Sequence, residues 1–237
     1  MYHLATIGLR ELDEQTRPVG DASGCIVRYR NAHFFLTVRH ATENQGNWAM
    51  EIEFDPHKKQ PLLYQLGGMG FLKVFRLKKG KIKFSRDMDF SYKLLPAPFP
   101  FPQPRFQILS ESGTITRDEP KLILESDLSL LPDPNEEYGF WGLNREGYNT
   151  YALRLAERLE TSMRYKGTKN HLHLFETQAP FTTYKRYQGC SGAPILDSHG
   201  RLVSLVVEGN KTNTGIYGFP LDAIRPALDV ELWQAGR

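Results

Sequence analysis

The sequence is divided into many short apolar runs separated by turn residues, and this pattern limits the fold more than any other feature. The runs are rich in β-branched and aromatic residues and are bounded by Gly, Pro and Asn. Many short strands with turn signals between them are typical of β-sandwiches and β-barrels. The expected strands are residues 25–29, 34–38, 50–54, 62–66, 71–77, 82–84, 90–95, 121–124, 138–143, 171–177, 195–196 and 202–207.

Two segments of the second half need separate treatment. Residues 151–165 alternate as in a strand at Tyr151, Leu153 and Leu155, but apolar residues also recur there at helical spacing, so strand and helix both stay open. Residues 221–234 are the best candidate for a helix. Pro226 marks either the first turn of this helix or a kink in it.

A proline-rich segment divides the strand-like runs into two groups. Prolines occupy every second position from Pro96 to Pro104. Because proline cannot donate a hydrogen bond to a sheet, this segment is expected to be extended. The predicted organisation is therefore an N-terminal β-unit at residues 1–95, a linker at 96–120, a second β-unit at 121–219 and a helical end at 220–237.

Composition excludes several classes of protein. The 237 residues are 40% hydrophobic and 24% charged, which is typical of a folded globular protein, and the net charge of +3 is too small to indicate nucleic-acid binding. The basic run at residues 78–83 is more simply the tip of a hairpin. No apolar stretch has the length of a membrane span. Two cysteines cannot form a disulfide framework, and the N-terminus has no signal-peptide pattern, so we expect a cytoplasmic protein.

The candidate for chemistry is the turn Gly189–Pro194, in which Ser191 lies between two glycines. Such a turn can expose a serine hydroxyl and direct neighbouring backbone N–H groups at one point, although an ordinary turn can have the same composition. A serine nucleophile needs a base, and His40 follows a buried-looking strand. Asp89 opens another apolar run and can orient the imidazole, with Asp87 as its rival.

Three motifs carry a resemblance to a known family. Thr37–Ala41 resembles the "Thr-Ala-Ala-His-Cys" motif of trypsin-like (chymotrypsin-fold) serine proteases, the run from Asp89 to Leu94 resembles their "Asp-Ile-Ala-Leu-Leu-Lys", and Gly189–Pro194 resembles their "Gly-Asp-Ser-Gly-Gly-Pro". The order His, Asp, Ser is also that of the family. Weaker similarities at residues 23–27, 200–209 and 215–217 extend the resemblance over most of the chain.

The resemblance implies an all-β fold of two six-stranded antiparallel barrels of chymotrypsin type with a C-terminal helix. The first barrel would carry His40 and Asp89, and the second would carry Ser191. In the family, the serine attacks a carbonyl carbon, the histidine transfers its proton and the aspartate holds the imidazole. The N–H groups of Gly189 and Ser191 would form the oxyanion hole.

The same resemblance implies a specificity pocket. Lys185 would lie at the base of this pocket, and Glu208, Gly209 and Gly215 would line its walls. A basic pocket favours an acidic side chain before the scissile bond.

The sequence departs from the family at two places in the nucleophile turn. The acidic residue before the serine is replaced by Cys190, so activation through a freed amino terminus has no acceptor carboxylate. The second glycine of the motif is replaced by Ala193. Cys190 raises the idea of a redox switch, and the alternative is a small buried residue.

The functional expectation is a serine endopeptidase of restricted specificity that acts on a protein or peptide substrate. The alternative is a protease-fold binding or regulatory module that is inactive or needs an activating protein partner to order its oxyanion hole. His171 and His173 lie on one strand without a third ligand at matching spacing. We therefore expect no metal and no cofactor.

Overall fold

The computed structural model describes the chain except for residues 44–45, 56, 58–59, 80, 100–104, 111–112, 119, 150–151, 182–186, 211, 213 and 237. Strands make up most of it, as the sequence predicts. Among the described helices, none combines the length and the apolar character needed to cross a bilayer.

The N-terminal half is an eight-stranded sheet. Seven strands follow the order β5-β4-β1-β2-β3-β7-β6, and β10 pairs with β2 outside this path. The neighbours along the path are antiparallel, whereas β10 runs parallel to β2. The strands are β1 (Ile7–Leu12), β2 (Pro18–Tyr29), β3 (Ala32–Thr37), β4 (Asn47–Asp55), β5 (Gln60–Gly67), β6 (Gly70–Lys78), β7 (Lys81–Leu94) and β10 (Ile123–Glu125).

The C-terminal half is a closed barrel of six strands in the order β11-β12-β13-β16-β15-β14. Its members are β11 (Glu137–Asn149), β12 (Ala152–Lys169), β13 (Leu172–Glu176), β14 (Pro194–Asp197), β15 (Leu202–Gly209) and β16 (Gly215–Pro220). The ambiguous segment 151–165 is therefore a strand over its described residues. Antiparallel pairing with β11 and β13 on its two sides overrides the helical spacing.

The strands that the sequence pattern missed are β1, β8, β9 and β16. β8 (Arg105–Ser110) and β9 (Gly113–Asp118) pair with each other within the segment expected to be a linker. The two runs expected at 82–84 and 90–95 are parts of one strand, β7. Pairing with β6 continues through the polar residues between them, with Lys73 opposite Asp87.

The helices are short. They are α1 (Tyr2–Ala5), α2 (Arg39–Thr42) and α3 (Arg225–Gln234), and a 3-10 turn, Asp222–Ile224, precedes α3. Pro226 lies in the first turn of α3, where a missing N–H has no intrahelical partner to lose. The predicted helix at 221–234 therefore begins four residues later than expected and is not kinked at this proline.

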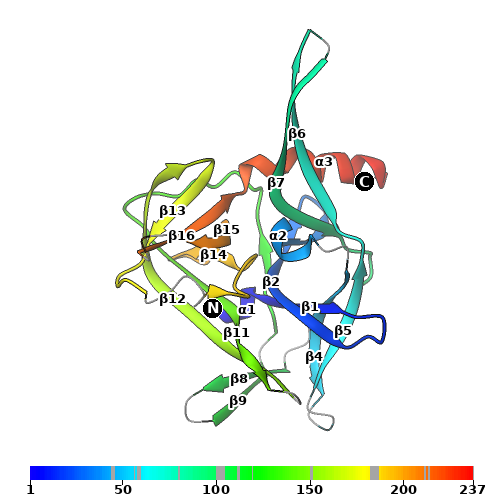
Figure 1. The fold of residues 1–237 in the computed structure, drawn as a ribbon, viewed down its shortest axis with the longest axis vertical. Helices are drawn as coiled ribbons and strands as arrows, with labels where there is room; N and C mark the ends of the chain where they lie inside the picture. The colour runs from blue at the N-terminus through cyan, green and yellow to red at the C-terminus, as the bar shows by residue number, and fades with distance from the viewer. Residues whose placement is uncertain are drawn as a thin grey trace.

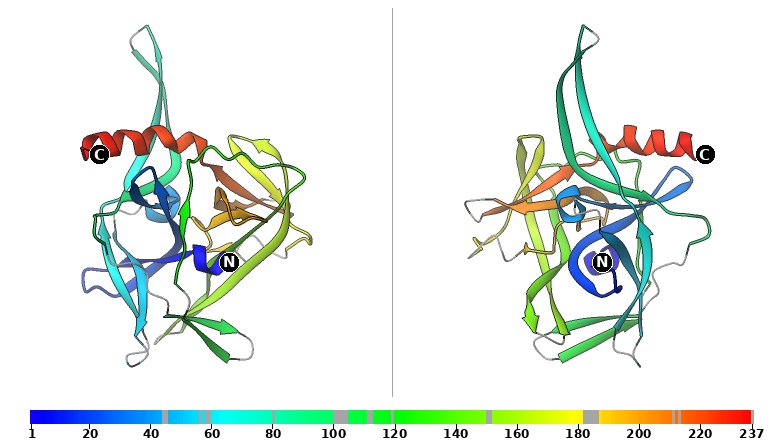
Figure 2. Two further views of the ribbon diagram at one scale, coloured as in Figure 1. Left: turned by 180° about the vertical axis from the view of Figure 1, so that it is seen from behind. Right: turned by 45° about the vertical axis from the view of Figure 1, so that its right-hand side comes forward.

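The two ends of the described chain cross over between the halves (Figures 1 and 2). α1 lies beside the C-terminal barrel, where the Thr6 hydroxyl donates to the carbonyl of Trp141 at 2.6 Å. α3 follows the C-terminal barrel but lies against the N-terminal half. Its Asp229 accepts a hydrogen bond from the Tyr29 hydroxyl at 2.9 Å.

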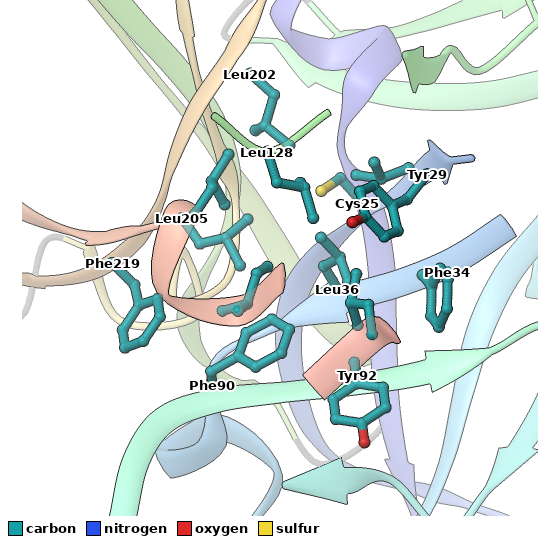
Figure 3. Packing of buried hydrophobic residues seen from close by; sticks show 14 of the residues in the cluster. Cys25, Tyr29, Phe34, Leu36, Phe90, Tyr92, Leu128, Leu202, Leu205 and Phe219 are labelled. Atoms are coloured by element: carbon teal, nitrogen blue, oxygen red, sulfur yellow. The ribbon is translucent and has the colours of Figure 1, made fainter. Parts of the chain in front are cut away.

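One apolar cluster joins the two halves and α3 (Figure 3). The rings of Phe90 on β7 and Phe219 on β16 are stacked with centroids 5.9 Å apart, and both side chains are buried. Leu228 of α3 is buried in the same cluster. Each half also has its own core, around Phe35 in the sheet and around Phe175 in the barrel. The shared cluster therefore fixes how the halves pack.

Substitution Phe90→Ala is expected to lower the free energy of unfolding by about 3–5 kcal/mol, because it leaves a cavity in the shared cluster. Urea denaturation measures this change. Leu131→Ala is the matched control, since Leu131 is 62% exposed and its truncation should cost no more than about 0.5 kcal/mol. Equal effects of the two substitutions would contradict the prediction.

Candidate active site

The structure brings His40, Asp89 and Ser191 together in one chain of hydrogen bonds. His40 Nδ1 lies 2.8 Å from Asp89 Oδ2, and His40 Nε2 lies 2.9 Å from Ser191 Oγ. The backbone N–H of His40 also donates to Asp89 Oδ1 at 2.9 Å. The carboxylate therefore fixes both the ring and the backbone of the histidine, and the second ring nitrogen faces the serine.

Strand pairing explains why His40 and Asp89 meet. β3 ends at Thr37, and its partner β7 runs antiparallel with Ser91 opposite Thr37. His40, in α2, comes three residues after Thr37, and Asp89, in β7, comes two residues before Ser91. Because the two strands are antiparallel, both residues lie at the same end of the pair. The register of one strand pair thus places the imidazole beside the carboxylate.

Asp87, the rival of Asp89, has different partners. Its carboxylate lies 2.6 Å from the Arg39 guanidinium and 3.3 Å from the Lys73 ammonium. The Arg39 guanidinium also lies over the ring of Phe71 at 5.3 Å. Asp87 therefore holds the residue before His40, whereas Asp89 holds His40 itself.

The electrostatics of the pair favour its charged form. Burial lowers the pKa of His40, but the hydrogen bond and charge of Asp89, with the charges of Glu208 and Glu43, outweigh burial and raise that pKa above its ordinary 6.5. Burial likewise raises the pKa of Asp89, but its hydrogen bond to His40 and the charge of His40 bring that pKa below its ordinary 3.8. An imidazolium at His40 is therefore stabilised by the site.

The turn that carries Ser191 depends on two glycines with positive φ. Gly189 has a φ of 94° and Gly192 has a φ of 88°. Residues that carry a Cβ rarely adopt such positive φ values. A Cβ at Gly192 would lie 2.1 Å from both the Ser23 carbonyl oxygen and the Thr37 Oγ1. The close approach of β2 and β3 to this turn thus requires glycine.

The hydroxyl of Ser191 has a second neighbour besides His40, the carbonyl oxygen of Val207 at 3.2 Å. Within the described residues, the N–H groups of Gly189 and Ser191 have no hydrogen-bond acceptor. Two backbone donors next to a serine hydroxyl are the arrangement that stabilises an oxyanion in acyl transfer.

Comparison with known proteins gives a fold and no close relative. No protein-family model matches the sequence, and no curated protein matches it. Among solved structures, a serine endoprotease from Yersinia pestis aligns with 100% of this chain and 68% of its own, at 13% identity and a TM-score of 0.52. Neuropsin, a serine protease of mouse brain, aligns with 98% of this chain and 96% of its own, at 10% identity and a TM-score of 0.56.

The fold is that of the trypsin-like serine proteases. The chymotrypsin-type architecture and the C-terminal helix predicted from the sequence are confirmed. The N-terminal sheet has eight strands in place of the expected six. An inactivated protease paralogue from the scabies mite also matches, over 96% of this chain and 94% of its own, at 11% identity and a TM-score of 0.58. A trypsin-like fold therefore does not by itself decide activity.

The residues expected to line the specificity pocket differ in their exposure to solvent in this fold. Lys185 lies outside the described residues. Glu208 is exposed and follows Val207, whose carbonyl oxygen contacts Ser191, and Gly209 comes next on β15. Gly215 is buried, and a Cβ there would lie 2.7 Å from the Phe175 carbonyl oxygen. Of this set, Glu208 is the residue that the described structure links to the site, because its charge contributes to the raised pKa of His40.

Both cysteines are buried, and neither is part of a disulfide. Cys190 is packed in the barrel core, where Gly142 on β11 leaves room for it: a Cβ at Gly142 would lie 2.9 Å from the sulfur. Burial also raises the pKa of the Cys25 thiol. The packing of Cys190 supports the interpretation of a small buried residue.

The two histidines considered as metal ligands do not form a cluster. His173 is buried with Nδ1 2.9 Å from the Ser204 hydroxyl, whereas His171 is exposed at the preceding turn. In the described part of the chain, no three His, Cys, Asp or Glu side chains are grouped so that they could hold a metal ion.

Sequence reasoning missed two contributors to the site, Ser23 and the carbonyl of Val207. The Ser23 hydroxyl donates to the carbonyl of Gly189 at 2.9 Å, across 166 positions of sequence. In the sequence, Ser23 stands out only as part of the weaker similarity at residues 23–27. Nothing in its residue type indicates which distant carbonyl its hydroxyl binds.

The imidazole of His40 is expected to titrate with a midpoint above 6.5 in the folded protein. Asp89→Asn should lower that midpoint, because it removes the charge that stabilises the imidazolium. Asp87→Asn is the control and should change it less, since Asp87 pairs with Arg39 and Lys73. NMR titration of the imidazole C–H resonances measures the midpoint, and an unchanged value in Asp89→Asn would contradict the assignment.

Proposed function

We propose that the protein is a serine endopeptidase that hydrolyses peptide bonds through an acyl-enzyme intermediate. The observation that carries this proposal is the continuous hydrogen-bonded chain from Ser191 through His40 to Asp89, with contacts of 2.9 and 2.8 Å. A serine hydroxyl is a weak nucleophile unless a base removes its proton as it attacks. The trypsin-like fold supports the same reaction class.

Each residue has a separate role in the proposed reaction. Ser191 Oγ attacks the carbonyl carbon of the scissile bond while His40 Nε2 takes its proton. His40 then donates this proton to the leaving amine, and the acyl group stays on Ser191. A water molecule, deprotonated by His40, releases the acyl group. Asp89 keeps the proton of the neutral imidazole on Nδ1, so that Nε2 is free to accept.

The oxyanion is the other charged group of the proposed reaction. The N–H groups of Gly189 and Ser191 would donate to it, and losing one such donor typically costs roughly 2.7–4 kcal/mol of transition-state stabilisation. Positive φ at Gly189 and Gly192 shapes the turn that presents them. The proposed reaction uses side chains and backbone alone, without a metal or cofactor.

The proposed substrate is a protein or peptide, bound in a pocket formed by Lys185, Glu208, Gly209 and Gly215. Lys185 favours an acidic substrate side chain before the scissile bond, whereas the exposed carboxylate of Glu208 favours a basic one close by. Because Lys185 and Glu208 would select different charges at neighbouring substrate positions, we propose that the protein cleaves only a restricted set of sequences. A cytoplasmic location is proposed as well, and it is supported by Cys25 and Cys190, neither of which is part of a disulfide.

A second candidate is a protease-fold binding or regulatory module that needs a protein partner to order its oxyanion hole. The observation that favours it is Cys190, since the family's activating carboxylate is missing from this position. The similarity to an inactivated protease paralogue is consistent with it.

A fluorophosphonate probe is expected to label the wild-type protein at Ser191, and Ser191→Ala should abolish labelling. Asp89→Asn should slow labelling strongly, since the same change at the triad aspartate of a trypsin-like protease lowers kcat about 10⁴-fold. Asp87→Asn should stay within a few-fold of wild type. Intact-protein mass spectrometry measures the extent of labelling with time. An unlabelled wild type would contradict the endopeptidase, and labelling only after addition of a partner would favour the second candidate.

Cleavage of a peptide library is expected to show a preference for Asp or Glu immediately before the scissile bond, because of Lys185. Lys185→Ala should remove that preference. Glu208→Gln should separately weaken any preference for Lys or Arg at neighbouring positions. Mass-spectrometric sequencing of the products measures both effects. Disfavoured Asp and Glu at the position before the bond would exclude the proposed role of Lys185.

A further inference from the structure

Ser23 on β2 of the N-terminal half is fully buried under the turn that carries Ser191 in the C-terminal half. Its hydroxyl donates to the Gly189 carbonyl at 2.9 Å, and its backbone N–H donates to the Ser191 carbonyl at 3.0 Å. One residue of one half thus binds two carbonyls of the nucleophile turn in the other.

The direction of the Ser23 hydroxyl proton is determined by its surroundings. The N–H of Leu143 on β11 donates to Ser23 Oγ at 3.1 Å, so the single proton of the hydroxyl is free to point at the Gly189 carbonyl, which can only accept. The carbonyl of Ser23 in turn accepts from the Thr37 hydroxyl at 2.7 Å. Every polar atom of Ser23 is bonded, which leaves the residue one orientation.

These bonds can be assigned to individual peptide planes of the turn. In a trans peptide the C=O and the N–H point in opposite directions, so a plane bonded at both ends cannot rotate. The plane between Gly189 and Cys190 is bonded at its carbonyl by the Ser23 hydroxyl and at its N–H by the Tyr187 carbonyl. The plane between Ser191 and Gly192 is bonded at its carbonyl by the Ser23 N–H and at its N–H by the Val206 carbonyl.

The plane between these two is bonded at one end. The Cys190 carbonyl accepts from the N–H of Ala193 at 2.9 Å, so the N–H of Ser191 on the same plane points the opposite way. That N–H is one of the two proposed oxyanion donors. The other donor, the N–H of Gly189, belongs to the residue whose carbonyl the Ser23 hydroxyl holds. Ser23 therefore constrains the backbone on both sides of the Ser191 N–H.

We propose that Ser23 is a positioning residue, which holds the turn so that the N–H groups of Gly189 and Ser191 face the carbonyl oxygen of the substrate. It acts through the backbone and touches no reacting atom. The inference rests on the proposed serine-protease function. A side chain of the N-terminal half would thus order a turn that belongs to the C-terminal half.

The kinetic test compares Ser23→Ala with Thr6→Val. Thr6 is also fully buried, and its hydroxyl also donates from the N-terminal end to a carbonyl of the barrel, that of Trp141. Thr6→Val therefore removes one buried bond between the halves, whereas Ser23→Ala removes two, the bond to the Gly189 carbonyl and the bond from the Leu143 N–H. Ser23→Ala is expected to lower kcat about 10- to 100-fold with little change in KM, which is less than the loss of a whole oxyanion donor. Thr6→Val should keep kcat within about two-fold of wild type. Ser23→Thr, which retains the hydroxyl, should recover most of the loss.

Thermal unfolding of each variant separates positioning from stability. Loss of kcat in Ser23→Ala at a temperature where both variants are fully folded, with kcat retained in Thr6→Val, would support positioning. Retention of kcat in Ser23→Ala together with a loss of Tm would overturn the proposal and leave Ser23 as a packing residue.

Amide hydrogen exchange provides a readout that needs no activity, so the proposal can fail independently of the proposed function. The N–H of Cys190 is expected to exchange faster in Ser23→Ala than in Thr6→Val, because the peptide plane that carries it loses the hydrogen bond from the Ser23 hydroxyl. Exchange rates that match in the two variants would overturn the role of Ser23, even if the wild type reacts with no fluorophosphonate. Faster exchange together with an unlabelled wild type would support the role of Ser23 in ordering the turn and place the failure on the endopeptidase.

Discussion

The contact between His40 and Ser191 spans the two halves of the molecule, and its length of 2.9 Å can be kept only if the halves pack in one fixed position. The shared apolar cluster around Phe90 and Phe219 supplies that constraint. Close-packed side chains resist small displacements, since even a gap of an ångström removes contacts on both sides. The packing of this shared cluster therefore contributes to fixing the distance between His40 and Ser191.

The N-terminal half contributes more to the site than the imidazole and its carboxylate. Thr37, three residues before His40, binds the carbonyl of Ser23, and Ser23 binds the turn of Ser191. The strand that leads into the base and the strand that holds the nucleophile turn are hydrogen-bonded neighbours, β3 and β2. A displacement of β3 would therefore change the base and the turn together. Cys190, which lies in the same turn, is packed in the barrel core.

The strands and the hydrogen-bonded group of His40, Asp89 and Ser191 were predictable where the signal is local. His40 and Ser191 lie in short motifs with recognisable order, and most apolar runs became strands. Asp87 and Asp89 could not be separated by alternation, because residues two apart lie on the same face of a strand. The ion pair of Asp87 with Arg39 decides between them, and it depends on the fold. The contact of Ser23 with Gly189 joins residues 166 positions apart, and no local pattern encodes it.

The crossing of the two ends has a consequence for synthesis on the ribosome. α3 completes the packing of the N-terminal half. The Tyr29 hydroxyl of that half donates to Asp229 of α3, which lies 200 residues further along the chain. The first β-unit is therefore incomplete while the second is being made, and its apolar surface beneath α3 is uncovered during that time. Docking of Leu228 and Leu232 closes this surface only after the nucleophile turn has already emerged. The order of translation thus delays the final packing of the N-terminal half until α3 has been made.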